Sequence, residues 1–223
     1  MTSSLRNRLV DGPESLGARA RARRAERFLT LFPELGEMHV LDLGGTLDFW
    51  QRLRTTPKSV TALNTALPPQ SSNLIPSWFT AHAGDACDPP LEVQIGRFDL
   101  VFSNSTLEHV GDEGRRQLFA DTVHRLGARH WVQTPNRYFP IEPHVLFPFQ
   151  QFLPRRGRGF VVRYWPLVHS RAKTMAGAMR TADNTELLTR ADMRDLFPTS
   201  SIIEERVAPG LPAKSFIATR TLP

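Results

Sequence analysis

The sequence predicts an α/β fold built on a largely parallel β-sheet. Between residues 38 and 134, short apolar segments of strand length alternate with helical segments, a pattern typical of parallel sheets with right-handed crossovers. Two of these strands, 40–43 and 98–103, end in turns that suit ligand binding. Because the carboxyl ends of parallel strands meet at one edge of a sheet, both turns are expected at the same end of the fold.

The predicted elements follow one another along the chain. An arginine-rich helix over 17–31, closed by Pro33, precedes the strand 40–43 and a helix over 48–54. Further strands are predicted at 59–63, 79–83, 98–103 and 130–134, with a helix over 112–126 before the last of them. A helix over 190–197 then leads to strands 201–207 and 215–220, which a turn at Pro209-Gly210 joins into an antiparallel hairpin at the sheet edge.

The segment from 136 to 181 loses regular apolar spacing. It mixes aromatic residues, prolines and arginines, and we interpret it as a lid or a substrate-binding insertion. At 223 residues, the chain is expected to form a single domain over 1–223, with 1–35 as an N-terminal helical extension.

The composition is that of a basic, soluble protein. The net charge is +6, and much of the excess lies in two stretches, 6–27 and 155–180. These stretches favour an anionic partner such as a phosphate-bearing substrate, a membrane surface or RNA, although arginines that merely solvate exposed faces explain them equally well. Cys87 is the only cysteine, which excludes an intramolecular disulfide and a cysteine-rich zinc site. No apolar run approaches the ~20 residues of a membrane span, so a cytoplasmic protein is expected, with peripheral membrane association left open.

The first turn contains Gly44 and Gly45 directly after the strand that carries Asp42. Glycine is favoured where the backbone turns sharply and a ligand must approach closely. A strand followed by such a turn and a helix start also exposes backbone N–H groups at the carboxyl end of the sheet. Two glycines alone are also compatible with a tight strand-to-helix connection that binds no ligand.

Four features in this order resemble the class I S-adenosylmethionine-dependent methyltransferases, particularly the type 11 methyltransferase domains. They are VLDLGG, the acidic turn GDA at 84–86, FDLVFSNSTLEHVG, and the C-terminal strand pair. The resemblance spans roughly 38–134 and, more loosely, 187–220. It implies a Rossmann-like sheet of seven strands, mostly parallel with one antiparallel edge strand, and helices on both faces. The implied cofactor is S-adenosyl-L-methionine, lying over the carboxyl ends of the first strands.

The resemblance also implies a set of cofactor-binding residues: Asp42, Gly44, Gly45, Thr46, Asn64, Asp85, Ala86, Asn104 and Ser105. The resemblance implies that Asp42 either orders the turn or meets the cofactor's amino group. Asn64 stands where the family usually has an acidic residue for the ribose hydroxyls. An amide can both donate and accept, but without charge assistance.

The remaining roles concern the adenine and the methionine portion. Asp85 matches the residue that meets the adenine amino group, and Ala86 matches the neighbouring backbone donor. Asn104 and Ser105 match the turn that faces the methionine carboxylate and the methyl group. Two structural alternatives stay open: Asp85 caps a loop, and Asn64 is an ordinary turn residue.

Two histidines are the candidates for catalysis. Methyl transfer requires alignment of the acceptor and, for a hydroxyl, removal of its proton, which suits an imidazole that titrates near neutral pH. His109 and His144 are predicted as base candidates, and Tyr138, Glu108 and Glu142 as orienting or substrate-contacting residues. The alternatives are that Glu108 and His109 stabilise a helix start and that His144 orders the lid.

The predicted site holds no metal, but the sequence leaves one minor alternative. Carboxylates and imidazoles are ordinary ligands, so Glu108, His109, Glu142 and His144 could gather around a divalent cation. Their separation along the chain leaves that geometry unconstrained.

The aromatic and basic residues of 136–181 indicate the acceptor. Aromatic faces stack on sugars or bases, and arginines bind phosphates. The preferred function is O-methylation of a sugar, glycolipid, lipid-linked glycan or other small molecule, with an anionic membrane surface as a further partner. RNA methylation is the alternative, since a basic aromatic surface also suits single strands. The third interpretation is a non-catalytic, cofactor-binding module at a membrane surface.

Overall fold

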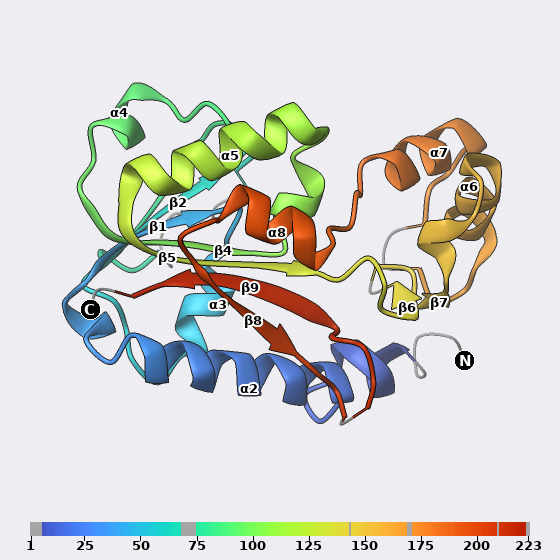
Figure 1. Ribbon diagram of the computed structural model, residues 1–223, viewed down its shortest axis with the longest axis horizontal. Helices are drawn as coiled ribbons and strands as arrows, with labels where there is room; N and C mark the ends of the chain where they lie inside the picture. Colours follow the sequence, from blue (N-terminus) through green and yellow to red (C-terminus); the bar gives the residue numbers. More distant parts are fainter. Residues whose placement is uncertain (1–5, 68–74, 143, 169–170, 209, 222–223) are drawn as a thin grey trace.

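The computed structural model describes residues 6–67, 75–142, 144–168, 171–208 and 210–221 (Figure 1). The predicted turn residue Pro209 and part of the proline-bearing stretch after Ala66 lie outside these residues. Gly210 is described, and its φ of +81° fits a turn that requires glycine.

The core of the fold is a seven-stranded sheet in the order β3-β2-β1-β4-β5-β9-β8. The strands are β1 (His39–Leu43), β2 (Ser59–Asn64), β3 (Phe79–Ala83), β4 (Phe98–Asn104), β5 (Gly127–Pro135), β8 (Ser201–Glu205) and β9 (Ser215–Arg220). Only β9 runs antiparallel to its neighbours β5 and β8, and β8–β9 forms the hairpin at the sheet edge. The predicted mostly parallel seven-stranded sheet with an antiparallel edge is confirmed.

Helices cover both faces of the sheet (Figure 1). On one face lie α2 (Leu16–Leu31) and α3 (Leu47–Gln51), and on the other lie α4 (Leu91–Gln94), α5 (Glu113–Leu126) and α8 (Arg190–Leu196). The helix predicted over 48–54 is shorter than expected because the amides of Arg52 and Leu53 bond to carbonyls three residues back, which tightens and ends it. The single turn of α4 was not predicted.

Each sheet face has its own hydrophobic core. Phe28 of α2 packs against Phe102 of β4 and Trp131 of β5, with ring centroids 5.0 and 5.3 Å apart. The opposite core contains Val101 of β4 and Phe119 of α5. Successive residues of β4 thus alternate between the two cores, as a strand buried on both sides requires. This packing holds the carboxyl ends of β1 and β4 side by side.

The segment after β5 is more regular than predicted. It contains the short pair β6 (Ile141–Glu142) and β7 (Phe147–Pro148), followed by α6 (Arg155–Tyr164) and α7 (Met175–Asp183). We call residues 136–183 the insertion. Figure 1 shows it beyond the carboxyl end of β5. Its buried cluster, which includes Val161, Val162 and Ala178, is separate from the two sheet cores.

Glycines in a basic segment explain why α6 was missed. Gly157 and Gly159 lower helix propensity, and four arginines obscure the apolar spacing. The structure uses Gly159 for close packing, because a Cβ there would lie 2.7 Å from Cγ of Met179 in α7. No described helix is both long enough and apolar enough to cross a bilayer.

Candidate functional site

The turn after β1 is in direct contact with the turn after β4. Gly44 has a φ of +86°, and a Cβ there would lie 2.1 Å from Oγ1 of Thr106. A Cβ on Gly45 would lie 1.6 Å from Oδ2 of Asp42. Both positions therefore exclude a side chain, and the two turns predicted to share one end of the sheet do so.

Asp42 lies directly beneath this turn and is fully buried. Its Oδ2 accepts a hydrogen bond from Nε1 of Trp50 at 2.7 Å, while Oδ1 has no partner among the described residues. Burial raises the pKa of Asp42 to about 7, with the bond from Trp50 opposing the rise. The geometry favours the first of the two predicted roles, in which Asp42 orders the turn.

Asn64 ties the end of β2 to the same turn. Its Nδ2 donates to the carbonyl of Gly45 at 2.8 Å, so the amide acts as a turn residue, and its Oδ1 is the atom left for a ligand. Thr46 precedes α3, and its side chain makes no capping hydrogen bond to that helix.

Asp85 is held by the protein itself. Its Oδ2 accepts from Nη2 of Arg115 at 2.6 Å, and its Oδ1 accepts from the amide of Cys87 at 2.9 Å. Burial would raise the pKa of Asp85, but the hydrogen bonds from Arg115 and Cys87 outweigh it and the pKa lies below its usual range. The loop-capping alternative is therefore observed, and any ligand shares this carboxylate with Arg115. Ala86 follows it, almost fully buried.

The turn after β4 is anchored by a polar network that the sequence did not indicate. Ser105 has a φ of 59°, and its hydroxyl donates to Oε1 of Gln133 at 3.0 Å. Nη1 of Arg24 donates to Oδ1 of Asn104 at 2.9 Å and to Oε1 of Gln133 at 3.0 Å. Arg24 also pairs with Glu205 at 2.6 Å. This arginine is one of many in α2, so nothing in the sequence distinguishes it from the surface arginines.

Glu108, His109 and His144 come together at the same end of the sheet. One carboxylate oxygen and one nitrogen of each histidine lie within 4.8 Å of one another, and the two imidazole rings meet edge to face at 4.9 Å. Glu108 and His109 do not cap the following helix, because Asp112 does so by accepting from the amide of Arg115. Both residues lie in a short 3-10 helix, Leu107–His109, that precedes this cap.

Glu142 stands behind the cluster and binds His144. Its Oε1 accepts from Nδ1 of His144 at 2.5 Å, and its Oε2 accepts from the amides of His144 and Val145 at 2.9 and 2.8 Å. Burial lowers the pKa of His144, but the carboxylate of Glu142 outweighs it and the pKa lies above its usual range. Burial also raises the pKa of Glu108, against the opposing charges of the two histidines.

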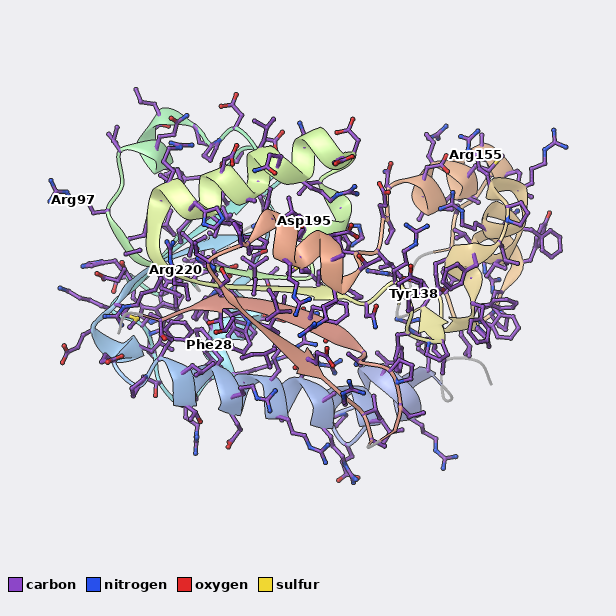
Figure 2. All side chains as sticks on the ribbon, viewed as in Figure 1. Phe28, Arg97, Tyr138, Arg155, Asp195 and Arg220 are labelled. Atoms are coloured by element: carbon purple, nitrogen blue, oxygen red, sulfur yellow. The ribbon has the colours of Figure 1, made fainter. Side chains whose placement is uncertain are left out.

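A cavity of about 330 Å³ opens within the insertion, where the insertion meets residues 185–187. Its wall includes Glu142 and His144 and is otherwise mostly polar, with Arg137, Gln150, Gln151, Arg158, Asp183, Thr185 and Glu186 among its residues. Oε1 of Gln151 is buried and has no partner among the described residues. Tyr138 does not line this cavity. It follows β5 where the chain passes into the insertion, is 60% exposed, and lies nearly parallel to the ring of Phe152 (Figure 2).

No protein-family model and no curated protein sequence matches the chain. Solved structures match over most of its length. The N-methyltransferase NodS from Bradyrhizobium japonicum, in complex with S-adenosylhomocysteine, aligns with a TM-score of 0.54 at 12% identity, covering 90% of this chain and 86% of that one.

Two further structures match to a similar extent. The 1,6-didemethyltoxoflavin-N1-methyltransferase from Burkholderia thailandensis gives a TM-score of 0.52 at 17% identity, covering 90% of this chain and 76% of that one. The methyltransferase domain of bacterial CtHen1 gives 0.53 at 12% identity, covering 91% and 100%. These likenesses, the strand order and the paired turns agree: the chain has the fold of the class I S-adenosylmethionine-dependent methyltransferases.

Proposed function

We propose that the protein is an S-adenosylmethionine-dependent methyltransferase that methylates a hydroxyl oxygen of a sugar, glycolipid or lipid-linked glycan. The observation that carries the proposal is the polar cavity whose wall includes His144 and Glu142. His144 of the cavity wall lies beside Glu108 and His109. These two residues closely follow Thr106, the residue of the second turn that contacts Gly44. An acceptor and a cofactor bound at these two places would meet at one end of the sheet.

The residues of the first turn fit the cofactor. At Gly44 and Gly45 the space of a side chain is filled by Thr106 and Asp42, so the turn presents only backbone, and Oδ1 of Asp42 is a buried acceptor without a partner among the described residues. Asn64, Thr46 and Asp85 supply polar atoms around this turn, and Asn104 and Ser105 supply them from the second turn. When bound, the cofactor supplies a methyl group on a positively charged sulfur, which leaves as a neutral thioether.

The chain's own residues then orient the acceptor and take its proton. A hydroxyl in the cavity beside His144 lies next to an imidazole whose Nδ1 is fixed by Glu142, which leaves Nε2 to face a ligand. General-base assistance of this kind is typically worth 10²- to 10⁴-fold in rate. His109 is the second imidazole at the same point.

The cavity favours a small, hydroxyl-rich acceptor. Its volume falls within the range of about 300–1,000 Å³ that small ligands occupy, and it is too confined for a folded RNA. The buried Oε1 of Gln151 would accept from a hydroxyl, and the guanidinium groups of Arg137 and Arg158 would attract an anionic group such as a phosphate.

The outer surface of the insertion favours an acceptor that is presented at a membrane. We call its exposed aromatic residues the aromatic surface: Phe149, Phe152, Phe160 and Tyr164, all between 50% and 59% exposed. Arg163 lies over the ring of Tyr164 at 5.2 Å, and Arg155 and Arg156 are exposed nearby on α6. Aromatic rings and arginines side by side suit the interface of an anionic bilayer.

Turnover with defined acceptors tests the proposal. The protein is incubated with S-adenosylmethionine and, in separate reactions, a glycolipid extract, nucleotide sugars and total RNA, and S-adenosylhomocysteine and methylated products are measured. We expect methyl ethers on the glycan-bearing acceptors, and at least a tenfold lower rate for His144→Ala at unchanged cofactor affinity. Methylation of RNA alone would contradict the proposal.

A further inference from the structure

Glu108 has a buried carboxylate oxygen that nothing described in the structure satisfies. Its Oε2 accepts from Oγ1 of Thr134 at 3.0 Å, but Oε1 has no hydrogen-bond partner among the described residues, and the side chain is 1% exposed. A buried carboxylate is retained in a protein when it is paired with a cation or hydrogen-bonded throughout. The unsatisfied oxygen therefore points to a missing positive partner.

Both neighbouring histidines have an oxygen acceptor at Nδ1. Nδ1 of His144 donates to Glu142, and Nδ1 of His109 donates to the carbonyl of Asn184 at 3.2 Å. Oxygen acceptors at both Nδ1 atoms favour the neutral tautomer with the proton on Nδ1 and the lone pair on Nε2; Oγ1 of Thr185 also lies 3.4 Å from Nδ1 of His109. A histidine that binds a metal is generally held in this way, by a carboxylate or carbonyl on its other nitrogen.

We propose that Glu108, His109 and His144 bind one divalent transition-metal cation. Two imidazoles and one carboxylate are donors of intermediate softness, which favours Mn²⁺, Fe²⁺, Co²⁺ or Zn²⁺. Ca²⁺ is disfavoured, because it prefers a set of oxygen ligands alone. One ligand atom from each of the three side chains lies within 4.8 Å of the others, and His109 is exposed. Ligands around a cation with bonds of about 2.0–2.2 Å are about 3.3 Å apart, so small side-chain rotations complete the set.

Three protein ligands leave open positions on the cation, and the cavity adjoins them. This deepens the proposed function and rests on it: the acceptor hydroxyl occupies an open position and loses its proton to water more readily there, because a divalent cation lowers the pKa of a bound oxygen. The oxygen then attacks the methyl carbon as the carbon–sulfur bond breaks, and the bonding electrons stay with sulfur. In this arrangement His109 and His144 are metal ligands. The cation, in place of an imidazole base, then activates the acceptor hydroxyl.

Metal binding can be measured without any methyl donor. EDTA-treated protein is titrated with Co²⁺, followed by visible absorption, and with Mn²⁺, followed by electron paramagnetic resonance. We expect one cation per chain in the wild type, and affinity at least tenfold weaker in Glu108→Gln and in His144→Gln. Glu108→Gln keeps an acceptor for Thr134, which preserves the fold. His82→Gln is the matched control, because it removes a histidine of β3 that is outside the cluster and should bind as the wild type does.

S-adenosylhomocysteine affinity, measured on the same preparations, separates the two proposals. Unchanged affinity in Glu108→Gln, together with lost cation binding, supports the metal site. Wild-type protein that binds S-adenosylhomocysteine but neither Co²⁺ nor Mn²⁺ overturns the metal site and leaves the proposed function standing. Equal cation binding by the wild type and both cluster variants also overturns it. Cation binding without any S-adenosylhomocysteine binding contradicts the proposed function and supports the metal site.

Discussion

Glu142 fixes His144 through both of its carboxylate oxygens. One oxygen accepts from the ring at Nδ1, and the other accepts from the backbone of His144 and Val145. Position and ring orientation of this histidine are thus set by a residue only two positions away along the chain. The side chain of Glu142 is a positioning group, since it acts on the site through His144.

Glu142→Gln should weaken Co²⁺ binding by about 10- to 100-fold, the usual cost of losing an outer partner of a metal-bound histidine. The amide retains an oxygen for the backbone donors but gives Nδ1 of His144 a poorer partner. Co²⁺ titration checks this, with Glu204→Gln of β8 as the control that should bind normally. Normal affinity in folded Glu142→Gln would show that Glu142 does not orient the ring for a metal.

Asp42 should make the protein less stable as the pH rises. Its pKa in the folded protein is about 7, above the ordinary 3.8, so the folded state holds the proton that the unfolded state loses. The contribution of Asp42 to the free energy of unfolding is fully present below pH 4 and is lost as the pH rises towards 7. Between pH 5 and pH 8 this loss amounts to about 2–3 kcal/mol. Asp42→Asn should remove that part of the pH dependence.

Urea denaturation at pH 5 and pH 8 measures the difference. Asp195→Asn, which changes an exposed aspartate of α8, should keep the wild-type pH dependence (Figure 2). The same fall in unfolding free energy for wild type and Asp42→Asn would mean that this carboxyl titrates normally.

Asp85→Ala should weaken adenosine binding by roughly 5- to 150-fold, equivalent to about 1–3 kcal/mol for an unpaired ligand donor. Adenosine lacks the methionine portion and therefore reports on the adenine end alone. Arg115→Met separates the ligand contact from the ion pair, since it removes the partner of Asp85 but leaves the carboxylate in place. Calorimetry should show that Arg115→Met binds adenosine with nearly wild-type affinity. If folded Asp85→Ala also binds adenosine normally, Asp85 does not contact the adenine.

The aromatic surface should determine membrane binding. Phe152→Ser combined with Phe160→Ser removes two exposed rings and should reduce co-sedimentation with anionic vesicles at least fivefold. Leu91→Ser combined with Ile95→Ser is the matched control, because it removes two exposed apolar side chains from α4 and its C-terminal flank, on the main sheet domain. Equal loss in both pairs, or no vesicle binding by the wild type, would count against a membrane role.

The strands could be predicted because each is a short apolar run that turn residues delimit. β3 and β9 begin and end where the sequence placed them, and β1 leads into the glycine turn as expected. Helices of the insertion could not be predicted in this way, since their packing depends on Gly159 lying against α7, which local pattern does not reveal.

The site was predictable in residue type but not in arrangement. His109 and His144 were candidates because of their chemistry, yet only the fold brings their rings to 4.9 Å. The anchor of the second turn, Arg24 on Asn104, joins residues from α2 and β4 and leaves no local signal. Tyr138 was expected in the site because it is aromatic and near β5, but its exposed ring lies against Phe152 instead.

The glycine turn is the part of the site on which the cofactor assignment depends, and calorimetry with S-adenosylhomocysteine tests it most directly. Gly210 provides a matched control, since its φ of +81° resembles the +86° of Gly44 but it has nothing within 4 Å of the added Cβ. We expect wild type and Gly210→Ala to bind S-adenosylhomocysteine equally well, and folded Gly44→Ala to bind it at least tenfold more weakly. Equal binding by folded Gly44→Ala, or no binding by the wild type, would contradict the cofactor assignment.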